Sequence, residues 1–566
     1  MKIKNKIKKI LFILIYINLA YIFMYKILNP VFVSNKIIIT YGLEPFDIIS
    51  KYPIAWKYIK KIYVATFIFS NIIYGNFIYS KFIFQNKNKK IEKEKYQIKS
   101  DKLNLLIGNN EKTGKNVYLS ESGLYQNFLI TGTIGSGKTS SAMYPFTEQL
   151  LQYNSKNQNK KIGILILDVK GNYYSQVKKY AEKYNLKKDL IIIKIGGKIK
   201  YNPLHKPNLK PAVIANRLKI IFNLFSENNS ESYWMDKAEQ VLTEAIKLCR
   251  IYNNNYVTFQ ELHKIVTIPG YYRDKIKIIK NLFVNGKLSK EQIYDLNSAL
   301  NFFQKEYDNL DPRTLGILKS EITRITNIFV SDYDICKIFC SPKNELNFKG
   351  FSEVINKGKI VVLNMNIAEY RNLSKIIAAY LKLDFQSEVM MALSNNHQRT
   401  TAFICDEYAE YVTKTDSEFF SLSREAKCIN IVSTQSYSSL KNTLKDETAV
   451  KVICQNLINK IWFRTDDIFT IEEAQKQLGK EDKVKTSKNI SENSKETRYN
   501  YMVNSLSSQD STISESFNLY TQNDYIYDTN FFTRNLQTFT ALAFLSDGNK
   551  IIEPQKLNMF PYFLND

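Results

Sequence analysis

The stretch TGTIGSGKTS, residues 131–140, decides the fold class of this chain. It contains the spacing Gly-x-x-x-x-Gly-Lys-Thr, from Gly132 to Thr139. The apolar residues NFLI lead into it, and the helix-compatible run SAMYPFTEQLL follows. A glycine-rich loop between a strand and a helix lets backbone N–H groups approach phosphate oxygens. The stretch therefore predicts a phosphate-binding loop that holds a nucleoside triphosphate, ATP, together with Mg²⁺.

Individual residues of this loop have separate predicted roles. Lys138 is expected to reach the β- and γ-phosphates, and the Thr139 hydroxyl to ligate Mg²⁺. The residues expected to contact the nucleotide are Gly132, Thr133, Ile134, Gly135, Ser136, Gly137, Lys138, Thr139 and Ser140.

A nucleotide hydrolase also needs a carboxylate on a neighbouring strand for the Mg²⁺ shell. Two aspartates end apolar runs: Asp168 in GILILD and Asp406 in TAFICD. Only Asp406 is followed directly by a second acid, Glu407. We predict that Asp406 orients the metal's water and that Glu407 polarises the attacking water. For Asp168, in the turn DVKGN, the alternative is a strand-end cap.

Three further residues are candidates for work on the γ-phosphate. Gln435 ends the run INIVSTQ and is expected to sense this phosphate or to position water. Arg424, in SLSREAKCIN, is predicted to reach the nucleotide of a neighbouring subunit, and Arg464, ending KIWFRT, competes for that role. Arginines at such positions usually form plain surface ion pairs, so both assignments stay open.

The soluble part of the chain reads as alternating strands and helices. Its strand candidates are continuous apolar runs, the pattern of a parallel sheet that is covered on both faces. They lie at 127–131, 163–168, 190–195, 359–365, 401–406, 430–435, 460–465 and 540–546. The predicted fold class is α/β, a P-loop nucleotide-binding domain with a mostly parallel sheet.

The chain divides into four predicted parts. Residues 1–85 form an N-terminal anchor, and 86–209 the first part of the nucleotide-binding domain. Strand signals vanish over 210–349, which is predicted to be an all-helical insertion. Residues 350–566 complete the nucleotide-binding domain. Within them the Ser- and Asn-rich stretch 484–518 is predicted to be a long surface loop or a disordered excursion.

The charge of the chain is strongly basic, with 79 Lys and Arg against 54 Asp and Glu, a net charge of +25. Such a balance favours anionic partners, either nucleic acid or a membrane surface. The alternative is a Lys- and Asn-rich composition inherited from an AT-rich genome. Six scattered cysteines and three histidines show no paired metal-ligand spacing, which indicates buried, reduced thiols.

Two apolar runs near the N-terminus, at about 10–25 and 62–80, approach the roughly 20 residues of a membrane span. Lysines flank both runs, which favours a two-helix hairpin with both ends in the cytoplasm. A cleaved signal peptide is the alternative for the first run, and an interfacial helix for the second. The predicted location is therefore the cell (cytoplasmic) membrane, multi-pass, with the ATPase domain in the cytoplasm.

The ordered motifs resemble those of the type IV coupling proteins, the TraG/TraD-like ATPases of conjugation and type IV secretion. After the phosphate-binding loop, the motifs that carry the resemblance are LILDVKGNYY, YNPL, YWMDKAEQVL, TAFICDEYAEY, REAKCINIVSTQS, NKIWFRTDD and ALAFLSDGNKII. Val169 stands where this family usually has Pro, and Asn172 where it often has Glu.

The resemblance implies a RecA-like, membrane-anchored ATPase that assembles as a homo-hexameric ring. Its implied partners are single-stranded DNA with its relaxase, or a protein, and the proteins of a type IV secretion channel. In this family the helical insertion faces the cytoplasm and helps to dock the relaxase complex. Two alternatives stay open: an FtsK-like translocase of double-stranded DNA, and a membrane receptor that uses ATP only for assembly.

Overall fold

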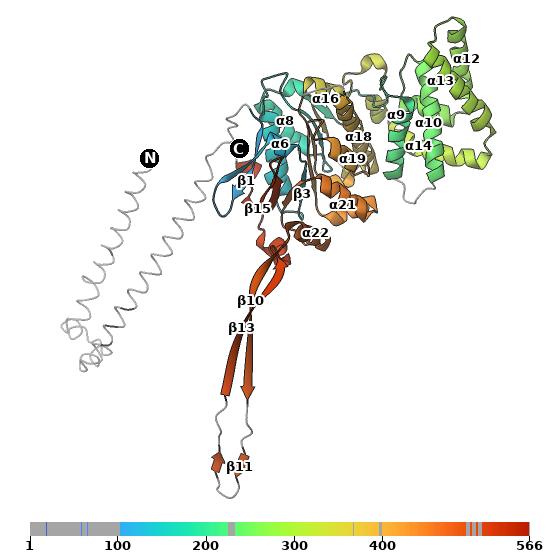
Figure 1. The fold of residues 1–566 in the computed structure, drawn as a ribbon. Coiled ribbons are helices and arrows are strands. Elements are labelled where there is room, and N and C mark those ends of the chain that lie inside the picture. The colour runs from blue at the N-terminus through green and yellow to red at the C-terminus, as the bar shows by residue number, and fades with distance from the viewer. Residues whose placement is uncertain are drawn as a thin grey trace, which may run out of the picture. The chain divides into compact units, whose positions relative to one another are not determined.

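The structure is a computed structural model of the chain. It describes residues 102–224, 232–365, 367–394, 399–493, 498–500, 505–507 and 512–564, together with Leu19, Tyr58, Lys61 and Ala65. The chain divides into two compact units, Met1–Glu94 and Lys95–Asp566, and the following description concerns the second unit (Figure 1).

A sheet of 11 strands forms the centre of this unit, in the order β2-β1-β15-β14-β9-β3-β8-β7-β4-β6-β5. The strands are β1 (Asn104–Asn110), β2 (Asn116–Ser120), β3 (Phe128–Thr131), β4 (Gly163–Leu167), β5 (Leu190–Ile193), β6 (Ile360–Leu363), β7 (Thr401–Cys405), β8 (Cys428–Thr434), β9 (Asn459–Trp462), β14 (Thr540–Ser546) and β15 (Ile551–Asn558). The run from β9 to β5 is parallel, whereas β14, β15, β1 and β2 pair antiparallel at the other edge. The predicted α/β fold with a mostly parallel sheet is therefore confirmed.

Both faces of the parallel part are covered, which explains why its strands read as continuous apolar runs. In β4, Ile164 and Ile166 belong to the core under α7 (Tyr144–Gln152) and α8 (Tyr173–Lys183). Leu165 and Leu167 point to the opposite core, which contains α18 (Asn372–Ser394). Because neither face meets water, β4 lacks the alternation of polar and apolar residues that a half-exposed strand shows.

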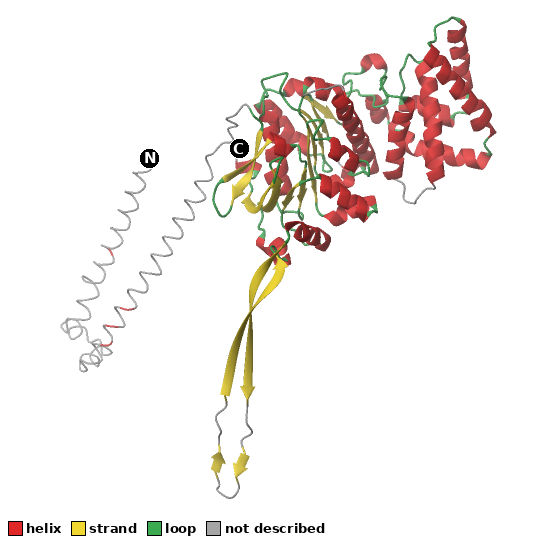
Figure 2. Cartoon of the chain, viewed as in Figure 1, coloured by secondary structure: helices red, strands yellow, loops and turns green. Residues whose placement is uncertain are grey.

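Between β5 and β6 the described residues form helices and turns only (Figure 2). The helices are α9 (Pro211–Leu224), α10 (Ser232–Tyr252), α11 (Phe259–Thr267), α12 (Tyr271–Val284), α13 (Lys290–Asn301), α14 (Pro312–Val330), α15 (Tyr333–Phe339) and α16 (Ser352–Lys357). α9 packs against α18. A buried ion pair joins them, since Arg217 donates to Asp384 at 2.8 Å.

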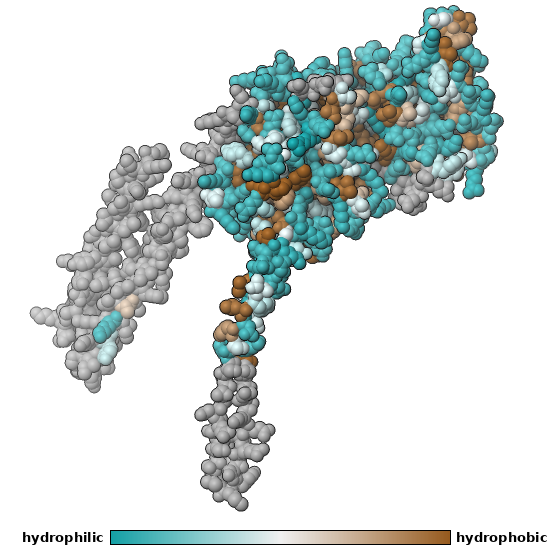
Figure 3. Space-filling model, viewed as in Figure 1, coloured by the Kyte–Doolittle hydropathy of each residue, from teal (hydrophilic) through white to brown (hydrophobic). Residues whose placement is uncertain are grey.

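The stretch 484–518, predicted to be a loop or disordered, instead belongs largely to a two-stranded antiparallel ribbon of β10 (Lys480–Asn493) and β13 (Thr512–Tyr525). β11 (Arg498–Asn500) and β12 (Ser505–Ser507) pair further along. The pairing register places Val484, Ile490, Phe517 and Leu519 on one face, 61–71% exposed (Figure 3). The prediction was wrong because it weighed polar composition and ignored this alternation with a period of two.

The predicted location in the membrane is corrected by the structure. Within the part of the chain that the structure describes, no helix is long and apolar enough to cross a bilayer. α18 shows why, since its 23 residues include the charged Lys375, Lys382, Asp384 and Glu388. This finding contradicts the multi-pass localisation. The runs 10–25 and 62–80, apart from Leu19 and Ala65, lie outside the described residues.

Candidate nucleotide site

The glycine-rich loop follows β3, all of whose residues are buried, at the carboxyl edge of the parallel sheet. After the loop the chain enters a π-helical turn, η2 (Thr139–Met143), and continues into α7. The backbone N–H of Gly132 donates to the Gln435 carbonyl at 3.3 Å, and that of Thr133 to the Arg464 carbonyl at 2.8 Å. The ends of β8 and β9 thus hold the start of the loop in place.

Gly137 occupies a position that only glycine fits well. Its φ of +100° is unfavourable for residues with a Cβ atom, and an added Cβ would lie 2.5 Å from a ring carbon of Phe539. Phe539 is held against the loop, because its backbone N–H donates to the Ser136 carbonyl at 3.2 Å. This aromatic neighbour comes from a distant part of the chain, and no motif in the sequence identified it.

The Lys138 side chain is buried and folds back over its own loop. Its ammonium donates to the Gly132 carbonyl and, at 3.3 Å, to the Thr133 carbonyl. Burial lowers the pKa of Lys138, while Glu407 and Asp406 act in the opposite direction. The ammonium therefore lies in the loop with carbonyl partners only, a position from which it can bind phosphate oxygens.

The two residues predicted to serve the metal are brought together by the fold. The Thr139 hydroxyl donates to Asp406 Oδ2 at 2.8 Å. The Ser433 hydroxyl, on β8, donates to Asp406 Oδ1. Asp406 is buried, with 1% of its surface exposed. A hydroxyl and a carboxylate at contact distance are oxygen ligands of the kind that Mg²⁺ prefers, so this donor set fits the ion.

Glu407 and Gln435 form the outer part of the site. Glu407 is half-buried and adopts the left-handed conformation, with φ +53°, which turns its side chain out of the strand direction. Burial raises the pKa of Glu407, and so does Asp406, whereas Lys138 and a hydrogen bond from Gln435 lower it. The carboxylate of Glu407 therefore lies near the carboxyl edge of the sheet and accepts a hydrogen bond from the Gln435 side chain.

Asp168 has a different role from Asp406. Its carboxylate accepts the backbone N–H groups of Lys170, Asn172 and Tyr173, each at 3.0 Å, at the start of α8. These bonds take up the donors that a helix leaves unpaired at its first turn. The alternative interpretation of Asp168 as a strand-end cap is the one that the structure supports.

The structure separates the two arginine candidates. Arg464 directly follows Phe463 after β9, at the same edge as the loop, and its carbonyl bonds Thr133. Arg424 precedes β8, at the opposite edge from Gln435. β8 is seven residues long, so about 23 Å of strand separates the two edges. Both arginines are exposed. Within one chain, Arg424 does not join the site.

A buried ionic cluster holds the segment that follows Glu407 in the sequence. Lys382 of α18 donates to Asp416 at 2.6 Å, and neither side chain is exposed to solvent. Lys382 also donates to the Tyr411 carbonyl at 2.6 Å, and the Tyr408 hydroxyl donates to Asp416. Sequence reasoning missed this cluster, because nothing local to Lys382 indicates a partner on another element.

No group of three or more His, Cys, Asp or Glu side chains suited to a metal occurs among the described residues. The Thr139–Asp406 pair would have to share Mg²⁺ with water and with the phosphates, as is usual for this ion. The arrangement, with a glycine-rich loop after a central strand, a Lys, a Thr–Asp pair and a half-buried Glu, defines the class of P-loop nucleotide-binding proteins.

A family model matches part of the chain. Residues 400–518 match the family model described as "TraM recognition site of TraD and TraG". Over these residues the match agrees with the resemblance to the TraG/TraD-like family of type IV secretion coupling proteins that the order of the motifs predicts. No curated protein matches the sequence significantly.

Two solved structures share the fold of this chain. The unbound bacterial conjugative coupling protein TrwBdeltaN70 has 14% identity and a TM-score of 0.50, over 84% of this chain and 91% of that chain. TrwB in complex with the non-hydrolysable GTP analogue GDPNP has 13% identity and a TM-score of 0.51, over 84% and 92%. VirB4 of Thermoanaerobacter pseudethanolicus has 14% identity and a TM-score of 0.47, over 82% and 98%.

Proposed function

We propose that the chain is an ATP hydrolase that uses Mg²⁺ and that its motor activity serves conjugative transfer. The Thr139–Asp406 contact carries this proposal, because it joins the phosphate-binding loop to an acid from a distant strand at 2.8 Å. Mg²⁺, when bound, neutralises charge on the phosphates. Lys138 binds phosphate oxygens, Asp406 and Thr139 hold the metal shell, and Glu407 accepts a proton from the attacking water.

The proposed cargo is single-stranded DNA with its relaxase, or a protein, delivered to the proteins of a type IV secretion channel. The net charge of +25 suits a motor that follows a phosphate backbone without reading sequence. We also propose that the chain works as a homo-hexamer. In such a ring, one arginine would complete the neighbouring site. Arg464 reaches the nucleotide edge of its own chain, whereas Arg424 could act only across a subunit boundary.

The division into a nucleotide-binding domain of 86–209 and 350–566 and a helical segment of 210–349 also belongs to the proposal. The helical segment is the proposed cargo-facing module. Replacing it with the segment of a related coupling protein is expected to redirect cargo choice in a mating assay and to leave ATP hydrolysis intact. A chimera that assembles normally but keeps its parent's cargo would move specificity elsewhere, to the stretch 484–518 or to the C-terminal tail.

The decisive experiment measures steady-state ATP hydrolysis by the full chain alone, with single-stranded DNA and with double-stranded DNA. Stimulation by single strands supports the coupling role, whereas stimulation by duplex alone favours the FtsK-like translocase. Nucleotide binding without turnover favours the alternative of a receptor that uses ATP only for assembly. Lys138→Ala is the control that shows the activity belongs to this site.

A further inference from the structure

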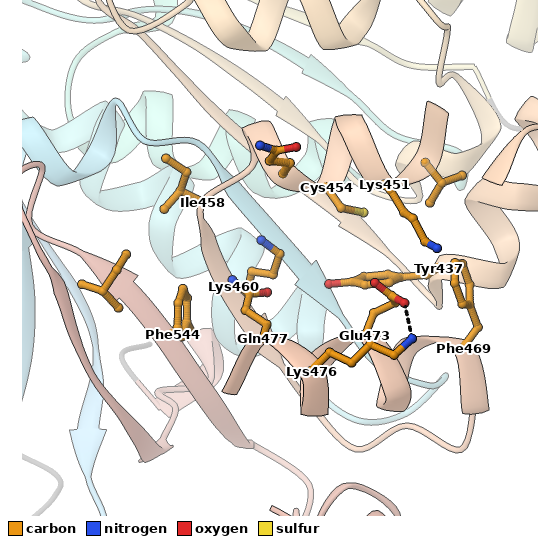
Figure 4. Close-up of a pocket in the computed structure, with 13 residues that line it drawn as sticks. Tyr437, Lys451, Cys454, Ile458, Lys460, Phe469, Glu473, Lys476, Gln477 and Phe544 are labelled. Carbon is orange, nitrogen blue, oxygen red and sulfur yellow. Dashed lines mark hydrogen bonds and ion pairs between the residues drawn. The ribbon is translucent and has the colours of Figure 1, made fainter. Parts of the chain in front are cut away.

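A cavity lies beside α20 (Tyr437–Leu444), between α21 (Glu447–Asn456) and α22 (Ile468–Leu478) (Figure 4). Its volume is about 500 Å³, within the range of small-ligand sites. Its apolar lining includes Tyr437, Val450, Ile458, Phe469, Phe544 and Ile551. The cavity therefore offers an aromatic and aliphatic wall to a ligand.

The floor of this cavity carries a buried cation, Lys460 of β9, which Figure 4 shows between the two helices. Only 4% of the residue is exposed. Its ammonium donates to the Leu457 carbonyl at 2.9 Å, at the end of α21. An ammonium has three N–H donors, and no carboxylate of the described residues forms an ion pair with Lys460. A buried cation without a counter-charge is costly, so the site is complementary to an anion.

The other charged groups at the cavity are already paired. Glu473 and Lys476 of α22 bond each other at 2.9 Å, and Lys451 of α21 pairs with Glu447 at 3.0 Å. Glu473 is thus the one acid in the lining, against the three lysines Lys451, Lys460 and Lys476. The lining therefore carries an excess of positive charge. Of its three lysines, Lys460 is the buried one.

From this geometry we propose that the cavity binds a carboxylate with an apolar or aromatic body, the carboxylate on Lys460 and the body against Tyr437 and Phe469. None of these residues belongs to the nucleotide site, so this inference does not depend on the proposed ATPase activity. The carboxylate has two possible sources, a free organic acid or a Glu side chain beside an aromatic residue in a peptide. Both present the same chemistry to the site.

The test measures binding to the full chain by calorimetry. The probes are 4-phenylbutyrate, for a free acid, and the peptide acetyl-Phe-Glu-amide. The alcohol 4-phenylbutanol is the matched control without an anion. We expect at least one acid to bind and the alcohol to bind at least about tenfold more weakly, as expected for loss of a charged hydrogen bond. The tighter of the two acids indicates the source. If neither acid binds, or if the alcohol binds equally well, the proposal is overturned.

Variants locate the anion. Lys460→Met keeps the length of the side chain and removes the charge, so it should weaken acid binding at least about tenfold. Lys460→Arg should retain most of the binding. Lys451→Met, at the rim, is the matched control and should change affinity by less than about threefold. Acid binding that survives Lys460→Met in a folded protein places the anion elsewhere and overturns the proposal.

A pH series provides a readout that does not depend on how the variants fold. Burial lowers the pKa of Lys460 to about 8, and the buried Cys454 thiol acts in the opposite direction. The groups that face it are Cys454 and Lys451 of α21, Glu473 and Lys476 of α22, and Tyr437 of α20. Since only the protonated ammonium attracts the ionised carboxylate, affinity should be steady between about pH 6 and 7.5, where the probe is ionised, and fall as pH rises above about 8. An affinity that stays constant up to about pH 9.5, as for an ordinary lysine, would contradict the assignment.

Discussion

Two aspartates at the carboxyl ends of neighbouring strands have different hydrogen-bond donors in this chain. Asp168 follows β4 and Asp406 follows β7, and each is 1% exposed. The backbone N–H of Asp406 donates to the Leu167 carbonyl at 3.0 Å, which places the two strand ends side by side. Yet Asp168 accepts backbone N–H groups, and Asp406 accepts side-chain hydroxyls.

The difference in donors decides what each carboxylate can do. Backbone donors at a helix start are fixed, so Asp168 is committed to holding α8 in place. The hydroxyls of Thr139 and Ser433 can rotate toward other partners, so Asp406 can exchange them for a metal shell. Burial and strand position are therefore the same for Asp168 and Asp406, and only their hydrogen-bond partners distinguish the two carboxylates.

The largest expected effect on ATP hydrolysis comes from Glu407, the residue that follows Asp406. Glu407→Gln removes the base and keeps the shape of the side chain, so hydrolysis should fall by about 10²–10⁴-fold. Nucleotide binding, measured with a fluorescent ATP analogue, should persist. Parent-level hydrolysis by this variant would remove Glu407 from the proposed mechanism.

Asp406→Asn should act on the metal rather than on the base. The variant keeps a hydrogen-bond acceptor and loses the negative charge, so the Mg²⁺ concentration for half-maximal activity should rise about 10–100-fold. Titrating Mg²⁺ at saturating ATP measures this shift. Ser433→Ala, which removes one donor to the carboxylate, serves as the comparison. An unchanged Mg²⁺ requirement would show that Asp406 is structural, like Asp168.

Asp168→Ala should give the reverse result. It leaves the N–H groups of Lys170, Asn172 and Tyr173, in the turn that leads into α8, without their acceptor, so the free energy of unfolding should fall by about 1–3 kcal/mol. Urea denaturation measures this loss. At a temperature where the variant is folded, kcat should stay within about threefold of the parent value. A loss of catalysis without a loss of stability would reverse the roles assigned to the two aspartates.

The smallest expected effect is a shift in the pH profile. Burial and Asp406 raise the pKa of Glu407 above its ordinary value of 4.5. A base acts only when it is deprotonated, so hydrolysis should fall as pH is lowered, at a higher pH than an ordinary Glu would give. Measuring kcat between about pH 4.5 and 8 locates this acidic limb, the pH range over which kcat falls. A limb at or below pH 4.5 would mean that the site is more solvated than its geometry indicates.

The sequence by itself determined the features that are encoded locally. The glycine spacing of 131–140 defines a loop, and each continuous apolar run that was predicted as a strand overlaps one, from Phe128–Thr131 to Thr540–Ser546. These inferences succeed because backbone geometry fixes both the spacing of a phosphate loop and the burial of a strand covered on two faces. Where composition replaced periodicity, as in 484–518, the prediction failed.

The tertiary structure alone decided which distant groups meet. No pattern around Lys382 indicates Asp416, nothing near Gly137 indicates Phe539, and Lys460 reads as an ordinary strand residue until α21 and α22 enclose it. The same holds for Asp168 and Asp406, which differ in their donors and not in their local sequence position. A side chain's partners depend on which strands lie next to one another in the sheet. That spatial order is set by the packing of the whole chain.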